Sequence, residues 1–344
     1  MTRGEASGLL GAAIACAGLV VGLSASPLQD QDDPGVRNGH AFAYDGRVSL
    51  LFGGATDREV VGDTWGWDGR AWQRFAVPGP PARTFAAAAG DGQGRVFLVG
   101  GSRVLFGDDT VAANRTAATR LLGDTWVWDG ARWTEVTGNQ PSPRAEAAAA
   151  WDPKRQRLVL FGGYSWVEGA RTYLQDTWEF NGKAWARFAT GGPSPRSGAA
   201  IAFDPELGQV VLFGGSPAKN DTWVWDGTAW SEVPAPTPPP GRYDAAMAAP
   251  LAGGSVLRFG GWDGQARTAD TWRLRGGLWT VLKGDAPPPR NYAAMTYDVK
   301  RGCYVLFGGQ DGVNVFGDVW ERCGTTDWKR VAKTGPRERV ANGH

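Results

Sequence analysis

The sequence has few of the residues from which catalytic and metal-binding sites are usually built. Its 344 residues include three cysteines and two histidines, His40 and His344, and their spacing matches no zinc site. It contains neither a phosphate-cradling glycine loop nor a Gly-x-Ser-x-Gly elbow. We therefore expect no metal and no cofactor, and we interpret His40 as a packed histidine rather than a lone base.

Net charge is nearly absent, because 36 lysines and arginines face 35 aspartates and glutamates. Without an overall field, the chain is not expected to bind nucleic acid or an anionic membrane surface. Any recognition by charge must therefore be local, and we expect a monomer.

The apolar run near the N-terminus, from Leu9 to Leu23, is shorter than the roughly 20 residues that cross a bilayer. Arg3 precedes this run and three small residues, at positions 24–26, follow it, which is the order of a secretory signal peptide. Residues 1–26 are therefore predicted to be a cleaved signal peptide, with an uncleaved anchor as the alternative. The mature protein is expected to be secreted or periplasmic.

Glycine, proline and tryptophan are abundant, with 51, 22 and 18 residues, which indicates many short strands and turns. Six glycine pairs each end an apolar run, at Gly53-Gly54, Gly100-Gly101, Gly162-Gly163, Gly214-Gly215, Gly260-Gly261 and Gly308-Gly309. An Asp-Thr-Trp or Asp-Val-Trp triplet follows each pair and begins at Asp63, Asp124, Asp176, Asp221, Asp270 and Asp318. A further tryptophan comes nine or ten residues after each aspartate, at Trp72, Trp133, Trp185, Trp230, Trp279 and Trp328. The glycine pairs lie 46 to 62 residues apart, which suits a four-stranded propeller blade.

The glycine pair after an apolar strand, with an aromatic third strand and a spaced tryptophan, resembles the kelch repeat over about residues 37–332. The Asp-Thr-Trp-Val-Trp-Asp-Gly form is similar to that of exported bacterial kelch proteins. The resemblance implies an all-β, six-bladed propeller with four antiparallel strands per blade, with the first strand of each repeat lining a central channel. It implies no single function. A copper site like that of galactose oxidase, which has a similar scaffold, would need paired histidines and tyrosines that this chain lacks.

The repeats divide the chain into a linker at 27–36, a propeller at 37–334 and a tail at 335–344. The predicted blades are 37–78, 83–138, 144–190, 196–234, 242–284 and 290–332. Each repeat supplies its own four strands, so the ring could close without a strand borrowed from the other terminus. The tail could be a seventh-repeat stub, a latching strand or a free end.

The loop between the second and third strands of each blade, the strand 2–3 loop, varies most in length and is longest in repeats two and three. Long loops on one face of a rigid scaffold often carry binding sites, although neutral insertion is the alternative. The candidate ligand-binding residues on this face are Arg103, Glu146, Tyr164, Asp244, Trp262, Tyr292, Gln310 and Asp311. Such a mixture of carboxylates, amides and aromatic rings suits a sugar or a peptide, and ordinary solvated loop polarity is the alternative. We expect Glu146 and Asp244 to be solvated in the free protein.

An arginine opens each repeat, at Arg37, Arg83, Arg144, Arg196, Arg242 and Arg290. Six converging guanidinium groups could bind an anion. The six aspartates of the Asp-x-Trp triplets should lie on the same face, however, one for each arginine. We therefore expect structural Arg-Asp pairs.

We interpret the chain as a non-enzymatic binding or scaffolding module for a carbohydrate or protein ligand at the face of the strand 2–3 loops. The alternative is a sugar mutarotase or epimerase of the six-bladed kelch type, in which Glu146 or Asp244 and an arginine would shuttle a proton. Cys303 lies five residues before Gly308, and Cys323 lies five residues after Asp318. If Gly308 pairs with Asp318 in a hairpin, the two cysteines face each other, which predicts a disulfide. Two packed free thiols are the alternative.

Overall fold

The structure is a computed structural model that describes Met1 and residues 33–104, 120–168, 170–188 and 191–333. The predicted signal peptide after Met1, most of the predicted linker, the centre of the repeat-two loop and the predicted tail lie outside these residues. Within the described residues, no helix has the length and apolar character needed to span a membrane.

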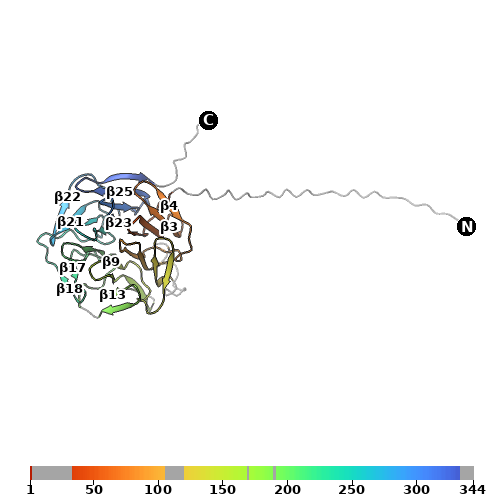
Figure 1. The fold of residues 1–344 in the computed structure, drawn as a ribbon, viewed down its shortest axis with the longest axis horizontal. Coiled ribbons are helices and arrows are strands. Elements are labelled where there is room, and N and C mark those ends of the chain that lie inside the picture. Colours follow the sequence, from red (N-terminus) through yellow and green to blue (C-terminus); the bar gives the residue numbers. More distant parts are fainter. Residues whose placement is uncertain (2–32, 105–119, 169, 189–190, 334–344) are drawn as a thin grey trace, which may run out of the picture. The chain divides into compact units, whose positions relative to one another are not determined.

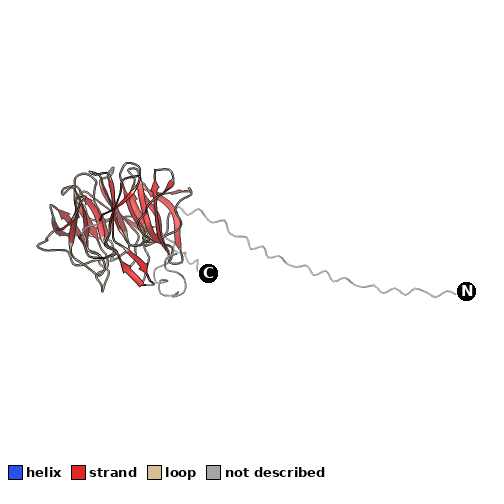
Figure 2. Cartoon of the chain, turned by 90° about the horizontal axis from the view of Figure 1, so that it is seen from below, coloured by secondary structure: helices blue, strands red, loops and turns tan. Residues whose placement is uncertain are grey.

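The described chain is all-β and forms a six-bladed propeller, which confirms the predicted fold class (Figures 1 and 2). Each blade is a four-stranded antiparallel sheet whose strands come from one repeat. A seventh, two-stranded sheet is a hairpin inserted into the third blade.

The strands of the first three blades and the inserted hairpin are β1 (Ala41–Tyr44), β2 (Ser49–Ala55), β3 (Val60–Trp67), β4 (Trp72–Phe75), β5 (Ala87–Gly90), β6 (Val96–Ser102), β7 (Leu121–Trp128), β8 (Trp133–Val136), β9 (Ala148–Asp152), β10 (Arg157–Phe161), β11 (Tyr164–Val167), β12 (Ala170–Tyr173), β13 (Thr177–Phe180) and β14 (Trp185–Phe188). The strands of the last three blades are β15 (Ala200–Asp204), β16 (Gln209–Phe213), β17 (Thr222–Trp225), β18 (Trp230–Glu232), β19 (Ala246–Ala248), β20 (Val256–Phe259), β21 (Thr271–Arg275), β22 (Leu278–Leu282), β23 (Ala294–Asp298), β24 (Cys303–Phe307), β25 (Asp318–Cys323) and β26 (Lys329–Lys333).

The turns within a blade are set by local sequence, as the fourth blade shows. The Asp204 carboxylate accepts hydrogen bonds from the backbone N–H groups of Glu206 and Leu207, which fixes the turn between β15 and β16. Asp226 does the same between β17 and β18, where Gly227 takes a φ of 103° that a glycine adopts without strain. Each blade therefore specifies its own strand pairing.

Neighbouring blades are joined through the tryptophan at or next to the start of the fourth strand. Its indole N–H donates to the threonine hydroxyl of the Asp-Thr-Trp triplet in the preceding blade, at 2.8–3.0 Å in five blades. These five pairs are Trp133 with Thr64, Trp185 with Thr125, Trp230 with Thr177, Trp279 with Thr222 and Trp328 with Thr271. The repeated tryptophan thus packs between blades and also satisfies its polar atom.

The ring closes through backbone hydrogen bonds at the channel rather than through a shared sheet. The residue two positions after each opening arginine donates its N–H to the carbonyl of its counterpart in the preceding blade, at 2.6–3.2 Å. These six residues, the inner ring, are Gly39, Phe85, Glu146, Gly198, Asp244 and Tyr292. The bond from Gly39 to Tyr292 joins the first blade to the last, and β1 also contacts β23 there. No strand is exchanged among the described blades.

Candidate ligand-binding site at the channel mouth

The first strand of each blade lines the central channel, as β9 and β23 show near the centre of Figure 1. The channel holds two cavities, one toward each face. The mouth cavity, of about 190 Å³, lies at the inner ring, on the same side as the strand 2–3 loops. Six residues of the first strands line both cavities, so the two meet partway along the channel, at Phe42, Ala88, Ala149, Ile201, Met247 and Met295.

The inner ring forces an unusual backbone on its members. All six have φ between 52° and 62°, a left-handed conformation that glycine adopts freely and other residues adopt at a cost. Only Gly39 and Gly198 are glycines; the other four positions carry Phe85, Glu146, Asp244 and Tyr292. Strained backbone of this kind tends to occur at functional sites. The side chains at these positions are therefore the candidates for a function of the mouth.

Glu146 is held by groups from two other segments. Its carboxylate accepts hydrogen bonds from Ser197 Oγ at 2.7 Å and from Arg171 Nη2 at 3.0 Å, and its side chain is only 6% exposed. Arg171 belongs to β12 of the inserted hairpin, and its guanidinium lies 3.8 Å from the ring centre of Tyr164 on β11. The inserted hairpin thus places the Arg171 guanidinium in an ion pair with Glu146 of the inner ring.

Asp244 is only partly satisfied: Tyr292 and Asn291 hydrogen-bond to its carboxyl group. Among the described residues its Oδ2 has no hydrogen-bond partner, although the residue is only 9% exposed. Burial, followed by the nearby Glu146, raises the pKa of Asp244 well above its ordinary value. Burial, Asp244 and Glu146 likewise raise the pKa of Tyr292, whose ring packs 4.8 Å from that of Phe85. We refer to Glu146, Arg171, Asp244 and Tyr292 as the mouth cluster.

The burial of the two carboxylates corrects one expectation from the sequence. Glu146 and Asp244 are not solvated in the free protein, because the inner ring places them inside the channel and the hairpin covers Glu146. Arg171 was not foreseen. The signal available for it was an arginine between Tyr164 and Tyr173 in the long strand 2–3 loop of repeat three.

The remaining candidate residues lie around the mouth, on loops and on the inserted hairpin. Tyr164 is buried under Arg171, and Trp262 is half-buried with Arg267 at 4.5 Å from its ring centre. Gln310 is bridged by its backbone to Asn291, while Asp311 caps its own turn by accepting from the N–H groups of residues 313 and 314. Arg103 is exposed at the start of the repeat-two loop. Three of the eight candidates, Glu146, Asp244 and Tyr292, thus belong to the mouth cluster. The ring of a fourth, Tyr164, packs against the guanidinium of Arg171.

A family comparison identifies the repeat. A model described as the KLHDC2/KLHL20/DRC7 Kelch-repeats domain matches residues 182–344. Together with the six-bladed fold, this match supports a kelch-repeat family. The chain is a kelch-repeat protein. The kelch propeller fold suggests a binding or scaffolding module.

The opening arginines of the kelch repeats are buried and paired in five blades. In each of these, the guanidinium donates to both oxygens of the triplet aspartate and to the carbonyl of the first glycine of the pair. The pairs are Arg37–Asp63, Arg83–Asp124, Arg144–Asp176, Arg196–Asp221 and Arg290–Asp318, at 2.6–2.7 Å. Burial alone would raise the pKa of Asp221, but the hydrogen bond from Arg196 holds it below its ordinary value. Five of the six arginines are therefore occupied with structural pairing.

The fifth kelch repeat departs from this arrangement. Arg242 lies 3.7 Å from Asp270 and donates instead to Thr268 Oγ1 and the Gly241 carbonyl. Arg258, on β20, takes its place by donating to Asp270 Oδ2 and to the Gly260 carbonyl. The sequence signal for this exchange was an arginine at a strand position where each of the other five repeats has leucine.

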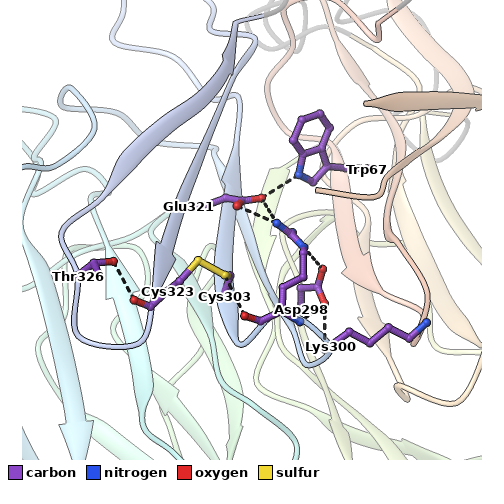
Figure 3. The surroundings of a disulfide bond; sticks show 8 residues. Trp67, Asp298, Lys300, Cys303, Glu321, Cys323 and Thr326 are labelled. Atoms are coloured by element: carbon purple, nitrogen blue, oxygen red, sulfur yellow. Dashed lines mark hydrogen bonds and ion pairs between the residues drawn. A yellow bond between two sulfur atoms is a disulfide. The ribbon is translucent and has the colours of Figure 1, made fainter. Parts of the chain in front are cut away.

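The structure joins Cys303 to Cys323 by a disulfide across β24 and β25, where the two residues are directly opposed (Figure 3). Their sulfur atoms and a Glu321 oxygen lie within 4.8 Å of one another, but both sulfurs are used by the disulfide. Glu321 accepts instead from Arg301 and from the indole N–H of Trp67 in the first blade (Figure 3).

His40 of the kelch propeller borders the mouth cavity and is packed, at 5% exposure, with its ring 5.0 Å from that of Phe307. Burial, followed by the nearby Arg37, lowers the pKa of His40 to about 3. The imidazole is therefore neutral at physiological pH.

Proposed function

We propose that this kelch protein binds a carbohydrate at the face of the strand 2–3 loops, with the mouth cluster at the centre of the site. The observation that carries the proposal is the buried Asp244, whose Oδ2 has no partner among the described residues beside the Glu146–Arg171 ion pair. A buried polar atom without a partner costs free energy that a ligand hydroxyl would recover. Sugars offer such hydroxyl groups at high density.

The rest of the site supports the same ligand class. Tyr292 and Phe85 line the mouth cavity with aromatic rings that can pack on the apolar side of a sugar, while Arg171 has guanidinium N–H groups besides the one that it donates to Glu146. The mouth cavity, at about 190 Å³, is smaller than the sites that enclose drug-sized molecules. It suits the terminal unit of a glycan, with the rest of the chain lying across the loops. The disulfide is in keeping with export to an oxidising compartment, which we propose from the predicted signal peptide.

A glycan array with the propeller tests the proposal, and titration of the best glycan by calorimetry measures its affinity. We expect Asp244→Ala and Arg171→Ala to weaken binding at least tenfold, because each removes a group that is inside the site. The matched controls are Glu206→Ala and Arg275→Ala, which remove an exposed ion pair between the fourth and fifth blades, away from the channel. Absence of glycan binding, or equal losses in test and control variants, would refute the carbohydrate assignment.

A second candidate function is sugar mutarotation, which the two neighbouring carboxyl groups favour. Asp244, with its raised pKa, could donate a proton to the ring oxygen while Glu146 accepts the proton of the anomeric hydroxyl, opening the ring. Reversal of both transfers would close it on the other face. Polarimetry with fresh single anomers tests this idea: Asp244→Asn should abolish acceleration while glycan binding persists. An uncatalysed rate in the presence of the wild-type protein would exclude it.

A further inference from the structure

The second cavity of the channel, the far cavity, lies at the end of the first strands that is opposite the mouth cluster. Its volume of about 370 Å³ falls within the range of about 300–1,000 Å³ that is usual for small-molecule sites. Its walls are mainly alanine, methionine and aromatic side chains. Methionine and aromatic walls adapt well to a bound apolar ring. The cavity therefore has both the size and the lining of a ligand site.

One strand position in each repeat shapes this cavity. It is the residue before the turn that leaves the first strand, and all six copies line the cavity: Tyr44, Gly90, Trp151, Phe203, Ala248 and Tyr297. The two small residues belong to blades two and five, which are opposite each other in a ring of six. They leave more room at the channel wall than the aromatic residues at the other four positions, and we call this room the slot. Trp151 and Phe203 border the cavity from the packed layers between blades, where Trp151 stacks on Phe97. A slot of this form suits a flat molecule.

The fifth blade also covers the cavity. Where the other five repeats have a turn-capping aspartate, this repeat has Ala249, followed by Pro250 and Leu251. Leu251 lies close to Gly92 of the second blade: a Cβ atom added to Gly92 would be 2.9 Å from Leu251 Cδ1. The leucine side chain therefore extends across the end of the channel. Leu251 also packs against the apolar cluster that contains Ala89 and Trp151. A side chain from blade five thus closes the slot against blades two and three.

The polar groups of the far cavity define what the ligand must carry. Trp151 is 3% exposed, and its Nε1 has no hydrogen-bond partner among the described residues. An indole N–H can only donate, so it needs an acceptor. Asp91 is the charged residue in the described lining, and its carboxylate is already engaged by residues 93 and 95 of its own turn. A charged ligand would therefore lack a counter-ion here.

We propose that the far cavity is a second binding site, which takes a flat, neutral aromatic molecule bearing one hydrogen-bond acceptor. The aromatic walls hold the ring in the slot, Trp151 Nε1–H donates to the acceptor, and Leu251 covers the bound molecule. This site is separate from the mouth cluster and stands whether or not the protein binds a carbohydrate.

Calorimetric titration of the propeller with 2-naphthol, which has a hydroxyl acceptor, and with naphthalene, which lacks it, tests the proposal. We expect saturable binding of both, and tighter binding of 2-naphthol. Trp151→Phe should weaken 2-naphthol binding about fivefold and leave naphthalene binding unchanged, because one hydrogen bond is lost. Ala248→Phe should fill the slot and abolish binding of both molecules.

The leucine that covers the cavity has a matched control on the blade surface. Leu251→Ala should weaken binding of both probes several-fold, whereas Leu278→Ala, which removes a leucine that is 56% exposed, should not. Because Ala248→Phe could overpack the channel, the melting temperature of this variant is measured as well. If it does not fold, the Trp151→Phe and Leu251→Ala variants test the proposal. No saturable 2-naphthol binding by the folded wild-type protein would overturn the proposal, as would unchanged binding in all three test variants.

Discussion

Arg258 Nη2 lies 3.0 Å from Asp270 Oδ2, so an arginine within a strand replaces the arginine that opens the repeat as partner of the triplet aspartate. Arg258 is fully buried, and burial lowers its pKa to about 10 even with Asp270 beside it. Arg242 remains nearby, 3.7 Å from the same carboxylate. The fifth blade therefore holds two cations for one aspartate, where the other blades have one.

This redundancy gives a prediction about stability. Arg242→Ala should cost about 1 kcal/mol or less, because Asp270 keeps Arg258, whereas Arg196→Ala should cost roughly 3–5 kcal/mol by leaving Asp221 without its partner. Arg258→Leu restores the residue of the other repeats and should allow Arg242 to take over Asp270. The double variant should lose far more than the sum of the single losses. Denaturant unfolding of the wild-type protein and the four variants measures this, and equal costs for Arg242→Ala and Arg196→Ala would contradict it.

The propeller could be predicted from sequence because the residues that form each blade lie within one repeat. Asp204 and Asp226 cap turns within one blade, and the Arg196–Asp221 pair is likewise internal to a blade. The regular spacing of these local signals gave the blade number and the strand order. The same locality explains the opposed cysteines, since the pairing of Gly308 and Asp318 sets the register of β24 and β25.

The site was less accessible to sequence reasoning, because it depends on contacts between repeats. Glu146 meets Ser197 of the next blade and Arg171 of an insertion, and neither partner occupies a position that the repeats share. The burial of Asp244 follows from the inner ring of backbone hydrogen bonds. Such bonds do not depend on the type of side chain, so the sequence carries no signal for them. Loop lengths singled out the face on which the inner ring lies, but they could not show that these carboxylates are enclosed.

The raised pKa of Asp244 predicts how stability depends on pH. Below the unfolded pKa of about 3.9, the carboxyl is protonated in both states. As pH rises from there to the higher folded pKa, the unfolded state loses its proton first, so the wild-type protein loses stability across this window. Asp244→Asn removes the titration and should be more stable than wild type at pH 7.

The stability difference between Asp244→Asn and wild type should shrink toward pH 4, which melting curves at several pH values would reveal. Glu206→Gln, which changes an exposed carboxylate, is the control and should show no such trend. A destabilised Asp244→Asn protein at every pH would instead mean that the carboxylate is a structural acceptor.

The disulfide between Cys303 and Cys323 predicts a local weakness on reduction. The bond closes a segment with a sequence separation of 20 residues, for which chain-entropy arguments give roughly 3 kcal/mol. Reduction, or replacement of both cysteines by alanine, should speed amide exchange in β24 and β25 before the other blades are affected. Thiol titration of the unfolded, unreduced protein without residues 1–26 should find no free thiol. Two free thiols per chain would contradict the bond.

The seam between the last and first blades lacks one hydrogen bond that every other junction has. Trp72 is the first-blade member of the tryptophan set whose other five indoles donate to threonine hydroxyls. Its counterpart in the preceding blade is Val319, because the last triplet is Asp-Val-Trp, and Trp72 Nε1 is buried without a partner among the described residues. Val319 is fully buried in the cluster against which Trp72 packs.

Val319→Thr should therefore stabilise the ring. Threonine has nearly the shape of valine, and its hydroxyl would accept from Trp72 Nε1 as Thr177 does from Trp230 at 2.8 Å. Recovering a buried unsatisfied donor contributes about 1–2 kcal/mol, which exceeds the loss of one buried methyl group at about 0.8 kcal/mol. Thr177→Val is the reciprocal control and should destabilise by a similar amount. A lower melting temperature for Val319→Thr would show that the seam is held by apolar packing around Val319, and that the indole of Trp72 gains nothing from a hydroxyl there.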